Sequence, residues 1–162
     1  MKIYYEDNHL LVVRKNANQP IQKDSSNDFD TLSKYKKYLK EVYKKPGNVF
    51  LGLVHRLDRP VSGIVVFAKT SKAASRLSNQ IRLNTWRKVY IAVAKGKVEP
   101  GTYIDYLYKD KKTNTSYVVD ETHPKGKKSK LKVLTVDYHP EEDLSYVKIK
   151  LITGRSHQIR VQ

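Results

Sequence analysis

Residues 55–63 read His-Arg-Leu-Asp-Arg-Pro-Val-Ser-Gly and are followed by the continuous apolar run Ile64 to Ala68. Asp58 therefore lies between Arg56 and Arg59, just before a segment with the composition of a buried strand. Nearby positive charge favours the ionised form of a carboxyl group. An ionised acid at the end of a buried strand can act as a nucleophile or as a base. Neighbouring acidic and basic residues more often form a plain surface salt bridge, so other segments have to decide between the two interpretations.

The composition indicates one basic domain with a polyanionic partner. The chain has 162 residues, which suits a single domain over residues 1–162 and is enough to bury a core. Its 32 lysines and arginines against 16 acids give a formal net charge of +16. Nucleic acid is the first candidate partner, since neutralised phosphates release condensed counterions, and an anionic membrane surface is the second.

Several classes of site and location are disfavoured by what the sequence lacks. It has no cysteine, which excludes disulfides and thiolate metal sites. Its five histidines show no ligand spacing, and no phosphate-binding glycine loop is present, so we expect neither a metal nor a cofactor. No long apolar run and no secretion signal occur, so we expect a cytoplasmic protein that does not cross a membrane.

The pattern of apolar residues predicts an α+β fold, with a mixed, mostly antiparallel β-sheet and flanking helices. Helices are expected at residues 31–45 and 72–83, capped by Asp30 or Thr31 and by Thr70 or Ser71 respectively. Strands are expected at residues 3–5, 10–13, 63–69, 88–95, 103–108, 117–119, 130–138 and 144–152. In the last of these, Val147, Ile149 and Leu151 should point one way and Lys148 and Lys150 the other.

Three segments together resemble the RluA family of pseudouridine synthases. They are residues 55–63, residues 87–96 (Arg-Lys-Val-Tyr-Ile-Ala-Val-Ala-Lys-Gly) and residues 151–161 (Leu-Ile-Thr-Gly-Arg-Ser-His-Gln-Ile-Arg-Val). The first segment is highly specific and the third is nearly as strong, whereas the second would be weak alone. The resemblance implies the pseudouridine synthase catalytic fold. It also implies an enzyme that detaches the base of a uridine in RNA, rotates it and rejoins it through carbon.

The resemblance assigns catalytic roles to Asp58, Tyr90 and Arg155. Asp58 is the catalytic aspartate, which either attacks the anomeric carbon of the sugar or assists proton removal from the sugar. Arg155 should pair with Asp58, although a phosphate contact or plain surface charge is the alternative. Tyr90 should stack on the extruded uracil and help to move a proton, although it could simply be a strand tyrosine packed in the core.

The same resemblance implies substrate contacts in two of the segments. A uridine inside folded RNA has to be flipped out of its stack, and Arg56 matches the residue that helps to fill the gap. His55 could contact RNA or orient its loop, and Ser62 and Gly63 should shape the turn. We expect further RNA contacts from Arg59 and Arg160. His157 and Gln158 should either contact RNA or brace the motif strand.

The chain also departs from the family pattern. A Lys-Pro-x-Gly turn is replaced by Lys15-Asn16-Ala17-Asn18, which should be less rigid. Gln162 stands where the third motif usually has histidine. The chain is expected to end inside a strand, without the C-terminal part of the family domain and without a separate RNA-binding module before it.

The sequence therefore predicts a monomeric RNA pseudouridine synthase acting on ribosomal or transfer RNA, with no protein partner implied. The alternative is a catalytically inactive RNA-binding protein or fragment derived from that family. A membrane-surface protein is disfavoured because no expected helix combines a basic face with a large apolar one. RNA would contact the lysines of residues 34–45 and 109–132, unless these only keep the protein soluble.

Overall fold

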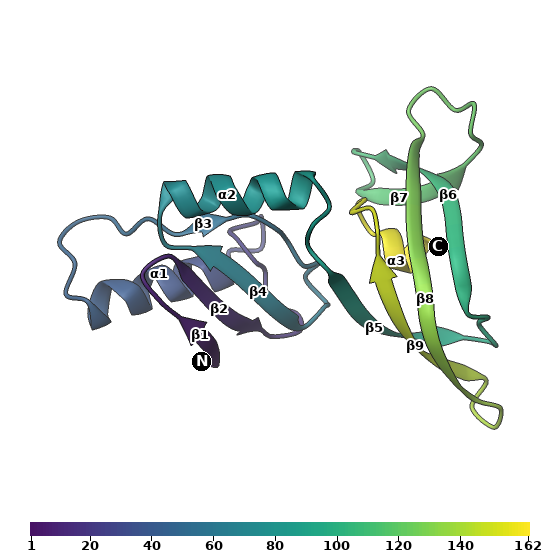
Figure 1. Ribbon diagram of the computed structural model, residues 1–162, viewed down its shortest axis with the longest axis horizontal. Helices are drawn as coiled ribbons and strands as arrows, with labels where there is room; N and C mark the ends of the chain where they lie inside the picture. Colours follow the sequence, from purple (N-terminus) through teal and green to yellow (C-terminus); the bar gives the residue numbers. More distant parts are fainter. The chain divides into compact units, whose positions relative to one another are not determined.

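The computed structural model describes residues 1–162, which form two compact units, Met1–Thr85 and Trp86–Gln162. Each unit contains its own antiparallel sheet (Figure 1). The predicted α+β class with mostly antiparallel pairing is confirmed. A single catalytic domain over residues 1–162 stays a prediction.

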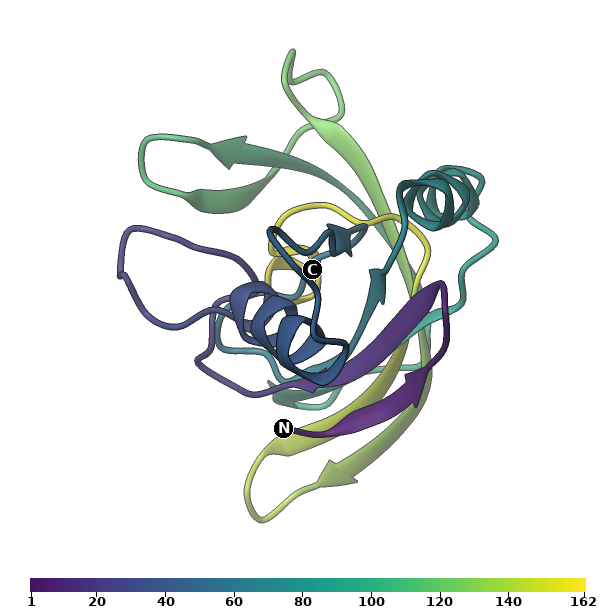
Figure 2. The same cartoon turned by 90° about the vertical axis from the view of Figure 1, so that its left-hand side faces the viewer.

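The first unit is a four-stranded sheet flanked by two helices. The strand order is β1 (Ile3–Glu6), β2 (Leu10–Lys15), β4 (Gly63–Ala68) and β3 (Gly52–Leu53). Helix α1 (Thr31–Val42) and helix α2 (Ser71–Arg82) lie on opposite sides of this sheet (Figure 2). The ring of Tyr35 in α1 contacts Phe67 of β4, and both side chains are buried. The apolar side chains on the inward face of these strands are thus buried, as the alternation of residues along a strand requires.

The helix starts agree with the predicted caps, but the first helix ends early. The Asp30 carboxylate accepts a hydrogen bond from the Ser33 amide at 2.8 Å, and the Thr70 hydroxyl accepts one from the Ala73 amide at 3.1 Å. Helix α1 ends at Val42 rather than at residue 45. Lys44 adopts a left-handed conformation with φ of 47°, and the following lysine precedes a proline, which disfavours helical geometry.

The second unit is a five-stranded sheet packed around one apolar cluster. The strand order is β5 (Lys88–Lys95), β9 (Leu144–Leu151), β8 (Lys127–His139), β6 (Gly101–Asp110) and β7 (Thr115–Val119). The predicted hairpin is confirmed as β8 and β9. The residues of β9 alternate as predicted, and the buried cluster consists of Leu131, Val133, Val147, Ile149 and Leu151.

The end of the chain is helical, so the expectation that it ends inside a strand is wrong. Residues Gln158–Val161 form α3, which lies within the curve of the second sheet (Figure 2). Gln158 is buried, and its Oε1 accepts hydrogen bonds from the Thr153 hydroxyl and from the Arg155 amide. His157 has a left-handed backbone, with φ of 58°, so the chain turns away from strand geometry. None of the helices has the length and apolar surface needed to cross a membrane.

Candidate active site

A buried lysine holds the loop that carries Asp58. Lys15 is the last residue of β2, and its side chain is fully buried. Four carbonyl oxygens share the three protons of its Nζ, those of Val61 at 2.6 Å, Arg59 at 3.0 Å, and Asp58 and Asn16 at 3.1 Å. The amide of Val61 also donates to the Asp58 carbonyl, at 3.0 Å. The main chain from Asp58 to Val61 is therefore tied to one ammonium group.

The energetics of this lysine link it to Asp58. Burial lowers the pKa of Lys15, while the charge of Asp58 raises it and that of Arg59 lowers it. A buried ammonium group without acceptors would be very costly, and here the carbonyl oxygens of the loop satisfy it. Any other conformation of the loop would leave the buried ammonium group without acceptors. Lys15 therefore constrains where the backbone of Asp58 can lie.

Sequence analysis missed Lys15, although a signal was present. Lysine is rarely fully buried, and the residue drew attention only as the start of a turn without proline or glycine. In β2, however, Leu11 and Val13 are buried, and Lys15 continues the same period-two face. A lysine at an inward position of a strand, directly before a polar loop, indicates an ammonium group that binds main-chain carbonyls.

His55 orients the start of the loop. Its Nε2 accepts a hydrogen bond from the Val66 amide of β4 at 3.0 Å. Only a neutral imidazole can accept such a bond, and burial lowers the pKa of His55. This contact supports the orienting interpretation of His55, while contact with RNA stays a prediction.

The two arginines beside Asp58 differ in their surroundings. Arg56 is exposed. The Arg59 guanidinium forms an ion pair with Asp28, a second one with Asp24 at 3.4 Å, and a hydrogen bond with the Ser26 hydroxyl at 2.8 Å. Arg59 thus ties the Asp58 loop to the preceding polar loop, and its predicted contact with RNA is not tested.

Gly63 ends the loop where a larger residue would not fit easily. A β-carbon at this position would lie 3.1 Å from the Leu57 side chain, which is itself buried. This close approach explains the glycine of the motif as a packing requirement and agrees with the predicted turn-shaping role.

The third motif is braced by its own side chains in the second unit. The Arg155 Nε donates to the Lys128 carbonyl at 3.1 Å, and its amide donates to Gln158 at 2.9 Å. Gln158 is 2 % exposed, so it braces the motif, which was one of its two predicted roles. Arg160 is exposed and His157 is half-buried.

Tyr90 lies on the core-facing side of β5. It is opposite Ile149 in the register of β5 and β9 and packs, partly buried, against the apolar cluster. This is the packing that the core-tyrosine alternative describes. A catalytic role for Tyr90 stays a prediction, as does the pairing of Arg155 with Asp58.

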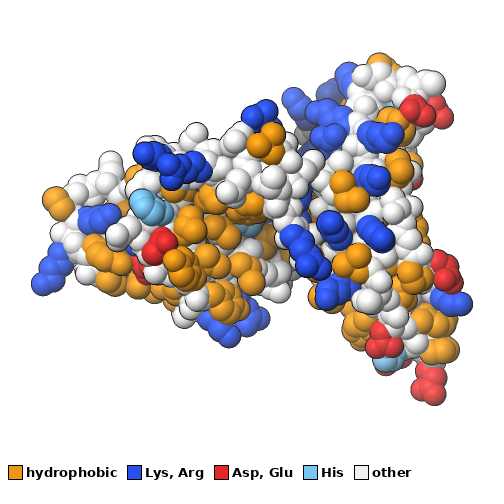
Figure 3. All heavy atoms as spheres, in the orientation of Figure 1, with side chains coloured by type: hydrophobic (Ala, Val, Ile, Leu, Met, Phe, Trp, Pro, Cys, Tyr) orange, Lys and Arg blue, Asp and Glu red, His pale blue; other side chains and the backbone are white.

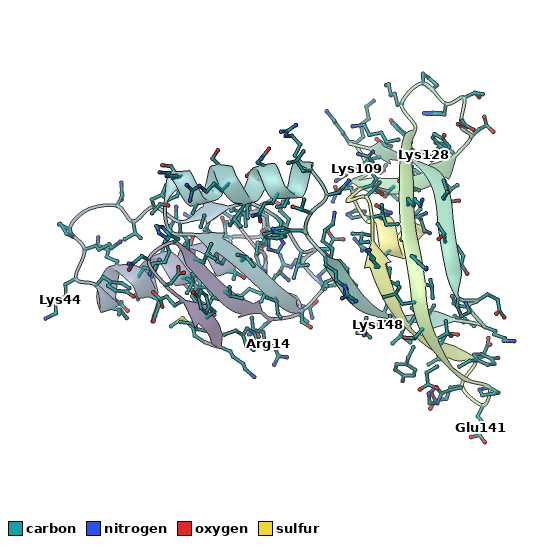
Figure 4. The ribbon with its side chains drawn as sticks, viewed as in Figure 1. Arg14, Lys44, Lys109, Lys128, Glu141 and Lys148 are labelled. Carbon is teal, nitrogen blue, oxygen red and sulfur yellow. The ribbon has the colours of Figure 1, made fainter.

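A basic hollow adjoins Arg155 in the second unit. It has a volume of about 620 Å³, and we call it the basic hollow. The Lys109 ammonium donates to the Ser156 hydroxyl at 3.2 Å across its lining. Figure 4 labels Lys109 and Lys128 at this end of the unit. Its charged lining residues are Lys109, Lys111, Lys125, Lys127 and Arg155. Such a concave set of cations suits an anionic ligand such as a phosphate group.

The sequence matches the RNA pseudouridylate synthase family over residues 9–162. The chain belongs to this family. That match includes all three motif segments. In residues 1–162 no group of three or more histidine and acidic side chains is placed to hold a metal ion.

Individual relatives support the assignment. The chain is 32 % identical over 163 residues, 99 % of its length, to an uncharacterized RNA pseudouridine synthase of Bacillus subtilis, of which it covers 52 %. It is 33 % identical over 159 residues, 98 % of its length, to the ribosomal large subunit pseudouridine synthase C of Vibrio vulnificus, of which it covers 47 %. The chain thus spans about half the length of these curated relatives.

A solved structure shows the same fold. The human RNA pseudouridylate synthase domain containing 4 superimposes with a TM-score of 0.76 at 20 % identity, over 99 % of this chain and 62 % of that one. The pseudouridine synthase fold predicted from the motifs is thereby confirmed.

Replacing Lys15 with methionine tests the loop clamp. The substitution keeps the length of the side chain but leaves carbonyl oxygens buried without a donor, so we expect a loss of about 3 kcal/mol in the free energy of unfolding. Denaturant unfolding measures this free energy for Lys15→Met and for the control Lys23→Met, in which an exposed lysine is replaced. Equal stability of the two variants would contradict the clamp.

The lowered pKa of His55 predicts a pH dependence. Between the ordinary histidine pKa of about 6.5 and the lower folded-state pKa, the unfolded chain binds more protons. Stability attributable to His55 is therefore present above pH of about 6.5 and is lost as the pH falls. We expect His55→Gln, which keeps an acceptor oxygen, to flatten the decline of unfolding free energy between pH 7.5 and 5. An identical decline in both proteins would assign the titration to other groups.

Proposed function

We propose that this protein isomerises uridine in RNA to pseudouridine, with Asp58 as the catalytic carboxylate. The observation that carries the proposal is the family match over residues 9–162, which contains Asp58, Tyr90 and Arg155 in their motif settings. The clamped loop around Asp58 supports it independently, since a catalytic carboxylate has to be held in a fixed place.

The reaction needs no second substrate. The carbon–nitrogen bond between sugar and base breaks, a carbon–carbon bond forms, and a proton leaves the ring carbon while the ring nitrogen gains one. Asp58 acts either on the anomeric carbon or in proton removal from the sugar, and both routes require an ionised carboxylate within reach. The bonds from Lys15 to the Asp58 and Arg59 carbonyls support this geometry by holding the main chain that carries the carboxylate.

Arg155 and Tyr90 complete the proposed site. A guanidinium forms a two-pronged contact with a carboxylate that an ammonium group cannot copy, so Arg155 would hold and pair with Asp58. Hydrogen bonds from its Nε to the Lys128 carbonyl and from its amide to Gln158 hold the side chain and the backbone of Arg155 in place. The Tyr90 ring would stack on the flipped uracil, with Arg56 filling the gap that the base leaves.

The proposed substrate is ribosomal or transfer RNA, and ribosomal RNA is favoured. The relative from Vibrio vulnificus is named for the large ribosomal subunit. The net charge of +16 supports an RNA partner of either kind. We further propose that the protein acts as a monomer in the cytoplasm, where such RNA is made.

Isomerisation assays on Asp58 variants test the function. Purified protein is incubated with ribosomal and transfer RNA lacking pseudouridine, and the modified positions are mapped. We expect Asp58→Ala to abolish modification while Asp137→Asn, at an exposed acid, retains it. Modification that survives Asp58→Ala defeats the assigned chemistry. Salt-dependent RNA binding by the wild type without any modification would favour the non-catalytic RNA-binding alternative.

Replacing Arg155 with lysine tests the proposed ion pair. We expect Arg155→Lys to fold but to lose about a hundredfold or more in single-turnover rate, since the planar fork is gone. Arg82→Lys, on the exposed end of α2, is the control for the same chemical change. Near-normal turnover in Arg155→Lys would mean that Arg155 and Asp58 are not partners in the reaction.

A further inference from the structure

One surface of the second sheet carries a cluster of lysines on neighbouring strands. Three of them alternate along β8 and two alternate along β9. We call this cluster the lysine face; it consists of Lys128, Lys130, Lys132, Lys148 and Lys150. Lys130 is half-buried and the others are exposed. Because side chains alternate across a sheet, all five point away from the apolar cluster and from Tyr90.

The register places like charges directly against each other. Lys132 pairs with Lys150 across β8 and β9, and like charges that are directly opposite destabilise a sheet. Along β8 the lysines repeat about every 6.8 Å, the advance of two residues in a strand. A sheet that only needed to be soluble could alternate acids and bases at these positions.

The lysines of this face have no acidic partner in the structure. None of the ion pairs of residues 1–162 includes them. Figure 3 shows blue side chains spread over β8 and β9, with red acids toward the two ends of the unit. Glu141, labelled in Figure 4, lies at the β8–β9 turn, well away from Lys128. No acid therefore forms an ion pair with these lysines, and Glu121, bonded to Tyr106, and Asp137, opposite Tyr146, lie toward the two ends of the face.

Aromatic side chains accompany the lysines on the same side of the sheet. Tyr106 pairs with Lys128 across β6 and β8, and Tyr146 precedes Lys148 by two residues in β9. Tyr146 is 43 % exposed, whereas Tyr106 is half-buried and its hydroxyl donates to Glu121. Exposed aromatic rings among lysines allow bases to stack while phosphates are neutralised.

The lysine face and the basic hollow lie on opposite sides of the sheet and meet at the end of β8. Lys127 lines the hollow, and Lys128, the next residue, begins the lysine face. Because consecutive residues of a strand point to opposite faces, cations run from one side of the sheet to the other around the end of β8. The carbonyl of Lys128 also anchors Arg155.

We propose that the lysine face binds the RNA backbone outside the catalytic site. The inference rests on the proposed function and extends it. A segment of RNA flanking the modified uridine runs from the basic hollow across β8 and β9, where its phosphates relieve the repulsion between Lys132 and Lys150. Val89, Ile91 and Val93 are exposed on the adjacent edge strand β5, so an anionic membrane is the competing partner. RNA is favoured because the cations lead toward Arg155.

The test is a salt series with a charge-matched control. Binding of Lys132→Thr/Lys150→Thr to a long fluorescent RNA is measured by anisotropy beside Lys23→Thr/Lys97→Thr, which removes two other exposed lysines. Threonine suits strand positions. We expect the first variant to bind about tenfold more weakly at 0.1 M salt, with its log–log salt slope smaller in magnitude by about 1.4. The control should retain wild-type affinity and slope.

The outcomes separate this inference from the proposed function. An equal loss of affinity in both double variants, or none in the first, overturns the lysine face as a binding surface. Binding of wild type to phosphatidylcholine–phosphatidylserine vesicles that the first variant loses, with RNA binding unchanged, assigns the face to membranes instead and also overturns it. We expect the Tm of the first variant to be at or above that of wild type, because the substitutions remove the repulsion between Lys132 and Lys150. If the wild type forms no pseudouridine but its RNA binding still depends on the lysine face, only the proposed function is overturned.

Discussion

The burial of the Lys15 ammonium is the constraint on which the rest of the first unit's site depends. A buried charge has to be paired or hydrogen-bonded, and no carboxylate forms an ion pair with Lys15. The carbonyls of Asn16, Asp58, Arg59 and Val61 provide its acceptors instead. The loop conformation is thus selected by solvation of a charge. Lys15 contacts only the main chain of Asp58, through its carbonyl oxygen.

Strand alternation organises the second unit in a comparable way. On β9, Val147 and Ile149 form the core, while Lys148 and Lys150 face outward. Tyr90, opposite Ile149, falls on the core side. One period-two pattern therefore separates the residue proposed to contact the base from those proposed to contact phosphates. A shift of one residue in register would exchange the two faces.

The sequence predicted those parts of the fold that local patterns control. The bounds of β5, the helix caps at Asp30 and Thr70, and the alternation of β9 all follow from composition and period. The helical end at Gln158–Val161 did not, because it depends on hydrogen bonds between Gln158, Thr153 and Arg155 that no periodicity reveals. The alternation of β2 indicated that Lys15 points inward, but three of its four acceptors lie more than 40 residues away in the chain, so the sequence did not show what it binds.

The cation that binds the main chain of Asp58 in the structure is not one of those beside it in the sequence. Arg59, adjacent in the chain, is paired with Asp24 and Asp28, so much of its charge is already neutralised. Lys15, distant in the chain, has a pKa that the charge of Asp58 raises. A motif that places an acid between two arginines therefore does not by itself identify its electrostatic partners. Arg59 instead fixes a neighbouring loop, and a lysine in a preceding strand holds the main chain of Asp58.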